Sequence, residues 1–475
     1  MVEVSDAVAK LKAIEVKWQT KWEKMKLHES NIVDSSHKGL LVTFPYPYLN
    51  GALHCGHGFT ASKVDFFARF KRLQGFNVLF PFAFHATGEP IVGVAKRVRQ
   101  KDASQIKALR LSGIPENELS KFTDPEYVAS YWREKAILVA KKVGWSIDWR
   151  RQFITIEPLY KKFIEWQYLT LRERGYVKKG THNVVYCPSC QSPTGDHDRL
   201  TGEGATVIEF NLVKFPVVNQ PSTFLVAATL RPETLYGATN VWIKPTGRYV
   251  KVVIKDETWI ISKTAAFKLN EQLVSAELTS EFEGRQILGL HVFNPILGGE
   301  ILVLPAEFVD PEHSSGVVYS VPAHAPYDYL ALRDLKTNLS SLVEYKIDPK
   351  SVEAIELINV IKSKEGSSTA FPGKEVVEKL QVENQSDPKA AEATDIVYKK
   401  EFHNGVMSES TGKYAGQRVS EVKEVLIADL KEQQIISTRG LFETSEMVIC
   451  RSNDRCIVKT LQDQWFIDYG NLGWK

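Results

Sequence analysis

Apolar positions in the first 30 residues recur at intervals of three and four. The series comprises Val4, Val8, Leu11, Ile14, Trp18, Trp22 and Met25. This spacing places the side chains on one face of a helix, so we predict an amphipathic helix from residue 4 to about residue 27. Large aromatic side chains are usually well buried. We therefore expect both tryptophans to dock on a core.

The stretch from Gly39 to Phe80 combines two kinds of hydrophobic pattern. It begins with an apolar strand, turns at Asn50-Gly51, continues as a helix and ends in a second apolar strand. The order strand, helix, strand predicts a parallel βαβ unit. The fold class that follows is α/β with a doubly wound parallel sheet.

The pattern changes after about residue 204. From there to about residue 345, apolar runs such as TFLVAATL and ILVLPAEFV alternate with prolines and glycines, which is typical of short strands. Short helices are predicted up to residue 440, and an aromatic-rich pattern then resumes. The simplest organisation is a β-rich domain at 205–440 inserted between residues 1–204 and 441–475 of the α/β domain.

Composition and charge exclude several classes of protein. The 475 residues are 43% hydrophobic and 25% charged, which is ordinary globular usage. A formal net charge of +3 leaves recognition of any anionic partner to local patches. We find no membrane-length apolar run and no targeting peptide, and five cysteines are too few for a disulfide scaffold. We therefore expect a cytoplasmic protein that does not contact membranes.

The strongest chemical signal lies where the first strand gives way to a helix. His54 and His57 share the first helical turn, so their ring N–H groups and the free amides of the helix end can converge on a phosphate. Gly56 would let a nucleotide approach the backbone closely. The alternative is two surface histidines that cap a helix. Their position in a βαβ unit favours nucleotide chemistry.

Cysteines flank the inserted segment. Cys187 and Cys190 lie just before it, and Cys450 and Cys456 lie just after it. Four thiolates brought together in this way suit a structural zinc ion. The spacing of the second pair is unusual for zinc, so unbound cysteines remain an alternative. His182 or His197 are alternative ligands.

Seven segments together resemble a known enzyme family. The segment FPYPYLNGALHCGHGFT closely resembles the first signature of class I aminoacyl-tRNA synthetases, in the form used by leucyl-tRNA synthetases. Six more follow in family order: LQGFNVLFPFAFHATGEPI, GWSIDWRRQF, YCPSCQSPTGDHDRLTGEG, TLRPETLYGATN, VPAHAPYDYLALRDLK and DQWFIDYG. They are similar to the archaeal and eukaryotic cytosolic branch, and the paired cysteines favour the archaeal kind.

The resemblance implies a Rossmann-type catalytic core and a leucine–tRNA ligase. Such an enzyme forms leucyl-adenylate from leucine and ATP with Mg²⁺, and then transfers leucine to tRNA(Leu). His54 and His57 would stabilise charge that develops on the phosphates. The leucine would be bordered by Thr43, Phe44, Tyr46, His85 and Glu89. Aromatic side chains are often buried, so packing in the core is an equally good interpretation of the Phe44 and Tyr46 rings. Bacterial relatives carry an aspartate near His85, so the partner of the leucine ammonium is unassigned.

The inserted segment resembles the family's editing domain. Shape alone distinguishes leucine from a slightly smaller side chain by only ~10–200-fold, so fidelity needs a hydrolytic site. The residues implied are Thr229, Arg231, Thr234, His324 and Asp328. Asp328 would hold the ammonium of the misacylated residue, Thr234 would exclude leucine, and Thr229 would place water and ribose. Without the resemblance, Arg231-Pro-Glu233 would be a plain turn and Asp328 a solvated carboxylate.

The second family signature, a lysine-containing KMSKS-type loop, does not occur after residue 440. A helical anticodon-binding domain is not evident either. We therefore expect the front part of a synthetase, either a fragment or one subunit whose partner chain carries both features. The alternatives are a hydrolase in which only the editing domain is active, and a tRNA-binding subunit without chemistry of its own.

Overall fold

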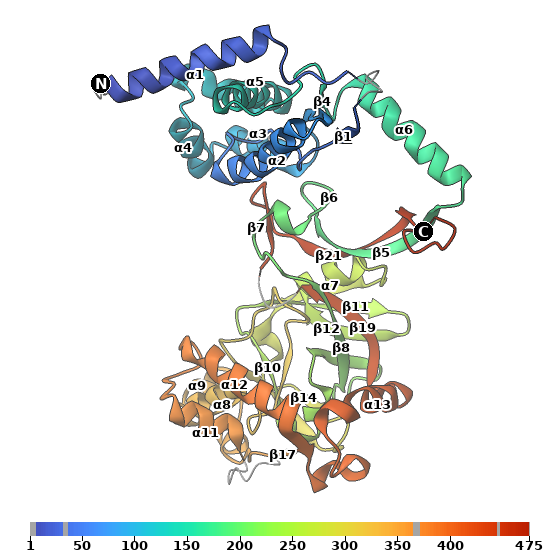
Figure 1. Ribbon diagram of the computed structural model, residues 1–475. Helices are drawn as coiled ribbons and strands as arrows, with labels where there is room; N and C mark the ends of the chain where they lie inside the picture. Colours follow the sequence, from blue (N-terminus) through green and yellow to red (C-terminus); the bar gives the residue numbers. More distant parts are fainter. Residues whose placement is uncertain (1–5, 32–36, 364–370, 444–446, 475) are drawn as a thin grey trace.

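The computed structural model describes residues 6–31, 37–363, 371–443 and 447–474. An α/β unit lies at one end of the molecule and a β-rich unit at the other, with an antiparallel ribbon between them (Figure 1). Within the described residues, none of the helices is long and apolar enough to span a bilayer.

The α/β unit contains two separate pairs of short parallel strands. β1 (Gly39–Leu41) pairs with β2 (Asn77–Leu79), and α2 (Cys55–Leu73) connects them. β3 (Phe82–Phe84) pairs with β4 (Gln152–Ile154). The predicted parallel α/β core is therefore confirmed, although β2 and β3 replace the single second strand expected from the sequence.

Helices complete the α/β unit around an aromatic core. They are α1 (Asp6–Lys24), α3 (Glu89–Arg99), α4 (Ala103–Leu111), η1 (Glu116–Thr123), α5 (Pro125–Val143) and α6 (Pro158–Glu173). Phe80, Phe82 and Phe84 are fully buried, and their spacing of two places them on the same side of the extended chain at β3. Trp132 and Trp145 are also buried in this core.

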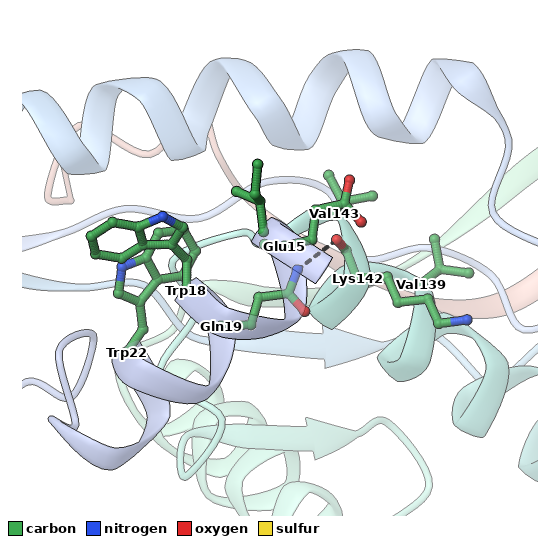
Figure 2. Close-up of a pocket in the computed structure, with 9 residues that line it drawn as sticks. Glu15, Trp18, Gln19, Trp22, Val139, Lys142 and Val143 are labelled. Carbon is green, nitrogen blue, oxygen red and sulfur yellow. Dashed lines mark hydrogen bonds between the residues drawn. The ribbon is translucent and has the colours of Figure 1, made fainter. Parts of the chain in front are cut away.

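The docking of α1 differs from the sequence expectation. Trp22 lies edge-on to His28 at 5.7 Å and beneath the Arg69 guanidinium at 5.3 Å. Trp18, however, is 44% exposed, so the prediction that both tryptophans are buried is wrong for Trp18. Gln19 Nε2 donates to the carbonyl of Lys142 at 2.7 Å, and α1 and α5 border a cavity of about 750 Å³ (Figure 2).

A long antiparallel ribbon joins the two units. β5 (Val177–Cys187) pairs with β21 (Ile457–Ile467) from Val177 opposite Ile467 to Tyr186 opposite Ile457. At the end of the ribbon, β6 (Ser192–Pro193) pairs with β5, and β7 (Arg199–Thr201) pairs with β20 (Ile449–Cys450). We call residues 187–201 and 449–456 the cysteine knuckle.

The β-rich unit is built on two sheets. The six-stranded sheet has the order β13-β11-β12-β9-β8-β19 and the four-stranded sheet the order β14-β15-β10-β16. Their strands are β8 (Val207–Pro216), β9 (Thr223–Thr229), β10 (Asn240–Ile243), β11 (Arg248–Ile254), β12 (Glu257–Ser262), β13 (Glu277–Glu283), β14 (His291–Phe293), β15 (Glu300–Pro305), β16 (Val318–Ser320) and β19 (Ile436–Glu443). Since β19 pairs with β8, the six-stranded sheet extends past residue 440.

Helices and one further strand pair lie around these sheets. They are η3 (Pro232–Gly237), α7 (Lys263–Asn270), η4 (Gly284–Ile287), α8 (Pro326–Thr337), α9 (Ser341–Glu344), α10 (Pro349–Glu353), β17 (Ile361–Ser363), α11 (Pro372–Lys379), α12 (Lys389–Asn404), β18 (Gly405–Met407), η5 (Glu409–Tyr414) and α13 (Val419–Glu432). Trp242, Tyr249 and Trp259 are fully buried in the unit. The remaining 3-10 turn of the chain, η2 (Asp196–Asp198), belongs to the cysteine knuckle.

Candidate functional sites

His54 and His57 form a reciprocal cap at the start of α2. His54 Nδ1 accepts from the Gly56 amide at 3.1 Å, and His57 Nδ1 accepts from the His54 amide at 3.2 Å. The two rings lie 4.0 Å apart. A Cβ at Gly56 would approach the His54 ring to 2.9 Å, so glycine lets this ring fold back over the helix end.

The cap fixes the chemical form of both rings. A nitrogen that accepts a hydrogen bond carries no proton, so a neutral ring must carry its proton on Nε2. Burial, and then the charge of His54, lower the pKa of His57, which favours the neutral ring there. Both histidines therefore present an Nε2–H donor beside the positive end of a helix dipole, an arrangement suited to a phosphate.

The segment before α2 places its aromatic residues on two sides. The Phe44 ring is buried against Phe82 at 5.1 Å, so it packs in the core. Tyr46 is half-buried and lies edge-on to Phe153 at 5.4 Å, whereas Thr43 is exposed. Of the aromatic residues expected to border leucine, only Tyr46 therefore leaves its ring accessible.

A second aromatic contact joins this segment to the strand that follows α2. The Tyr48 ring stacks on the His85 ring at 4.2 Å. His85 Nε2 lies 2.8 Å from the Thr87 hydroxyl. Burial lowers the pKa of His85, and the negative charge of Asp198 opposes this shift. The contact places His85 next to the segment that precedes α2. Tyr48, which holds His85 by stacking, was not among the residues selected from the sequence.

Glu89 begins α3 directly after Gly88, which has a φ of 95°. Its side chain is only 9% exposed, and its Oε2 has no partner among the described residues. Burial raises the pKa of Glu89, whereas a hydrogen bond with the Cys190 thiol lowers it. The expected leucine neighbour therefore lies against the cysteine knuckle.

In the β-rich unit, three hydroxyls gather around one carbonyl. The Thr234 and Tyr319 hydroxyls both donate to the Arg231 carbonyl at 2.8 Å. Thr229 Oγ1 lies 3.2 Å from the Tyr319 hydroxyl and accepts from the Arg231 amide at 2.9 Å. Because the Tyr319 proton is already used, the Thr229 hydroxyl must donate to Tyr319. We call Thr229, Thr234 and Tyr319 the hydroxyl cluster.

The Arg231 side chain lies between two carboxylates. Its Nε contacts Glu233 at 3.0 Å and its Nη2 contacts Glu401 at 2.5 Å. Glu401 also accepts from His324 Nδ1 at 2.6 Å, and His324 Nε2 in turn accepts from the Val360 amide at 2.9 Å. These contacts make Nδ1 the protonated nitrogen of His324. His324 thus lies in a buried charge network.

Asp328 lies in the first turn of α8 and is only 3% exposed. Its Oδ2 accepts from the Val321 amide at 2.7 Å. Burial raises the pKa of Asp328 to about 7. A carboxylate with this pKa would gain strongly from a cationic partner, because the partner would offset the cost of its burial.

The cysteine knuckle brings together three of the four predicted metal ligands. Cys450 Sγ lies 3.6 Å from Cys187 Sγ and 3.9 Å from Cys190 Sγ. Zn–S bonds of about 2.3 Å in a tetrahedron give S···S separations of about 3.8 Å, so the three thiols fit zinc. Asp454 joins them, and the four candidate ligand atoms all lie within 4.8 Å of one another.

The other predicted ligands have different contacts. Cys456 Sγ contacts the Thr194 hydroxyl at 3.6 Å and interacts with the Cys450 thiol, but it lies outside the group of four candidate ligand atoms. His182 lies edge-on to Phe466, and His197 Nε2 is 3.5 Å from the Tyr48 hydroxyl. Asp454 was missed by sequence reasoning because a single aspartate carries no spacing signal.

Residues 17–473 match the family model described as tRNA synthetases class I (I, L, M and V). The chain therefore belongs to the class I tRNA synthetases. Its relatives within that family include the leucine–tRNA ligase of Methanothrix thermoacetophila, which is 46% identical over 97% of this chain and 48% of its own length. The leucine–tRNA ligase of Pyrococcus furiosus is 46% identical over 98% of this chain and 48% of its own.

These relatives confirm the predicted relationship to archaeal leucyl-tRNA synthetases. The chain spans about half the length of the curated relatives it matches. The crystal structure of GlLeuRS-CP1 aligns with 50% of this chain and 100% of its own, at 28% identity and a TM-score of 0.43.

We expect the burial of Asp328 to make the stability of the protein depend on pH. Its pKa is about 7 in the folded chain but about 3.9 when unfolded, so the folded state retains a proton that the unfolded state has lost. The free energy of unfolding should therefore fall by roughly 4 kcal/mol from this group alone as pH rises from about 4 to 7.

Asp328→Asn should remove this part of the pH dependence, whereas Asp395→Asn at an exposed helix position should leave it unchanged. Urea unfolding at a series of pH values measures both. Parallel profiles for wild type and Asp328→Asn would contradict the shifted pKa.

Proposed function

We propose that this chain activates leucine with ATP and Mg²⁺, and hydrolyses mischarged tRNA(Leu), as part of a leucine–tRNA ligase. The observation that carries the first activity is the reciprocal cap of His54 and His57, which fixes two Nε2–H donors at the end of α2. Gly56 between them would lie under the nucleotide. Class I synthetases use ATP with Mg²⁺, and the relatives are leucine–tRNA ligases.

In the activation step, the leucine carboxylate attacks the α-phosphate and pyrophosphate leaves. Negative charge builds on the phosphate oxygens in the transition state. Two preorganised Nε2–H donors beside a helix amino terminus stabilise that charge without having to reorient. Tyr46, His85 and Glu89 would border the leucine, and Thr43 would lie at the edge of that site.

Editing would use the β-rich unit. In this proposal Asp328 binds the ammonium of the misacylated residue, and the methyl group of Thr234 excludes leucine. The Thr229 hydroxyl helps to place water and the terminal ribose. Arg231 and His324 hold the site through Glu401, which contacts both. The hydroxyl cluster supports a steric rather than a chemical role, since the single hydroxyl proton of Thr234 is used on the Arg231 carbonyl.

The relatives are longer than this sequence. Because the relatives are about twice as long, we propose that the KMSKS-type loop and the anticodon-binding domain come from the other half of such an enzyme. That half is either continuous with this chain or a second subunit. tRNA(Leu) is the proposed macromolecular substrate.

For the cysteine knuckle we propose one structural zinc ion. Cys187, Cys190 and Cys450 would supply three ligands, and Asp454 fits the fourth position better than Cys456 because its carboxylate lies within the cluster. Lys96 Nζ contacts the Asp454 carboxylate at 2.5 Å and would balance its charge.

Activation can be tested by leucine-dependent exchange of pyrophosphate into ATP. His54→Ala and His57→Ala should each lower the rate by roughly 10²–10³-fold, because each removes a donor from the developing charge. Cys55→Ala, on the same turn, is the control and should retain activity. The assay needs an enzyme that includes the other half. If both histidine variants stay within a few-fold of wild type, the phosphate role is wrong.

Editing can be tested by deacylation of leucyl-tRNA and of a mischarged tRNA. Thr234→Ala should enlarge the pocket and allow hydrolysis of leucyl-tRNA. Thr234→Val keeps the bulk of the side chain and should still spare leucyl-tRNA. Asp328→Ala should clear mischarged tRNA roughly 10- to 100-fold more slowly, because a charge-assisted hydrogen bond is lost. Leucyl-tRNA that survives Thr234→Ala would argue against the steric role.

Zinc binding can be tested on the chain by itself. Elemental analysis after a chelator wash should find about one zinc per chain, and Cys187→Ser or Asp454→Ala should lower this value. Cys456→Ser and Cys55→Ser should retain the metal. Replacement by cobalt should give thiolate absorption bands that only the first two variants weaken. Wild-type protein without metal would reject the site.

A further inference from the structure

Asp198 ends η2 in the cysteine knuckle and has an oxygen without a partner. Its side chain is 16% exposed, and its Oδ1 is buried with no hydrogen-bond partner among the described residues. The other oxygen, Oδ2, lies 3.5 Å from His197 Nε2. Buried carboxylate oxygens are rarely left unpaired, so this one indicates a missing ligand.

Backbone contacts hold Asp198 in place. Its amide donates to the Gly195 carbonyl at 3.0 Å, and its carbonyl accepts from the Arg451 amide at 3.1 Å. Arg451 Nη2 donates to the carbonyl of His197 at 2.7 Å. The turn that carries Asp198 is therefore fixed by the two segments that also carry the candidate metal ligands.

The Asp198 carboxylate faces the aromatic pair that joins the first signature to the next strand. His197 Nε2 lies 3.5 Å from both Asp198 Oδ2 and the Tyr48 hydroxyl. Burial raises the pKa of Tyr48, and the charge of Asp198 raises it further. Gly93, one turn after Glu89 on α3, packs against the Arg451 backbone, and the Arg451 amide donates to the Asp198 carbonyl. The turn that carries Asp198 therefore lies beside the helix that carries Glu89.

A second carboxylate on the neighbouring helix also has an unpaired oxygen. Glu89 Oε2 is also buried without a partner in the part of the chain described, and its side chain is nine-tenths buried. The nearby Lys96 pairs with Asp454 at 2.5 Å. Uncompensated buried negative charge is costly, and a bound cation would remove that cost.

We propose that Asp198 binds the α-ammonium of the amino-acid substrate, with Glu89 as the second carboxylate. An ammonium group offers three N–H donors, and Asp198 Oδ1 and Glu89 Oε2 are two acceptors without another use. The Tyr48 ring, stacked on His85, reaches Asp198 through His197. This inference rests on the proposed activation of leucine, and it supplies the ammonium partner that the first signature leaves unassigned.

The test compares two adenylate analogues that differ only at the α-position. Leucylsulfamoyl-adenosine carries the α-ammonium, and its 2-hydroxy-4-methylpentanoyl counterpart carries a hydroxyl. Calorimetry on the whole chain measures the affinity of each. Asp198→Asn should weaken the ammonium analogue by roughly 10- to 100-fold and leave the hydroxyl analogue within a few-fold. Glu89→Gln should show the same selectivity with a smaller loss.

Asp196→Asn is the matched control on the same turn. The Asp196 carboxylate contacts Arg199 at 2.9 Å and accepts from the Gly204 amide at 2.7 Å. These contacts are structural, and we assign Asp196 no part in binding the ammonium. It should not discriminate between the analogues. Metal content, measured on every variant, reports whether the knuckle is intact.

The outcomes separate this inference from the proposed function. If Asp198→Asn binds both analogues like wild type, or loses both equally, Asp198 does not bind the ammonium, while leucine activation stands. If Asp198→Asn is too unstable to measure, Glu89→Gln decides the question. Equal effects of Glu89→Gln on the affinities of the two analogues would contradict the proposal that the two carboxylates bind the ammonium. If the wild-type chain binds neither analogue, the proposed activation site itself is wrong.

Discussion

The contact between Cys187 and Cys450 is the constraint on which the rest of the structure depends. These residues are 263 positions apart, yet their sulfur atoms are 3.6 Å apart. The pairing of β5 with β21 brings both strands of the ribbon to this point. The two ends of the β-rich unit therefore meet at one place, and the chain leaves that unit through the same ribbon by which it enters.

The cysteine knuckle also packs against the proposed activation site. A Cβ at Gly93 would lie 3.2 Å from the Arg451 backbone, so α3 packs directly on the knuckle. Lys96 on α3 contacts both Asp454 and, at 2.9 Å, Ser189. The turn that holds Asp198 is therefore fixed relative to Glu89 by backbone packing and ion pairs. A metal ion at the knuckle would stiffen this arrangement, since it would link the same segments.

The sequence was most informative where the signal is local. The βαβ unit follows from hydrophobic periodicity, and the positions of His54 and His57 follow from a motif at a helix start. Tyr319, Glu401 and Asp198 carry no such signal. Each lies far along the chain from the residues it serves, as with Glu401, which is 170 positions from Arg231. Only the tertiary fold could bring them together.

Burial explains the expectations that the structure modified. Phe44 alternates with Thr43 and Pro45, and a β-like period of two sends its ring to the core. The periodicity of α1 predicts an apolar face correctly, but periodicity does not say whether a partner surface is long enough to cover that face. Trp22 finds such a surface at Arg69 and Gly144, and Trp18 does not.

Arg231 shows why the β-rich unit keeps a buried charge network. A buried ion pair is weak evidence for stability, because desolvation offsets much of its attraction. The charge network instead fixes the position of Arg231. Glu233 and Glu401 hold the guanidinium from two sides, which fixes the residue whose carbonyl accepts from Thr234 and Tyr319. Since that carbonyl orients the hydroxyl cluster, the two ion pairs help to fix the orientation of the Thr234 side chain.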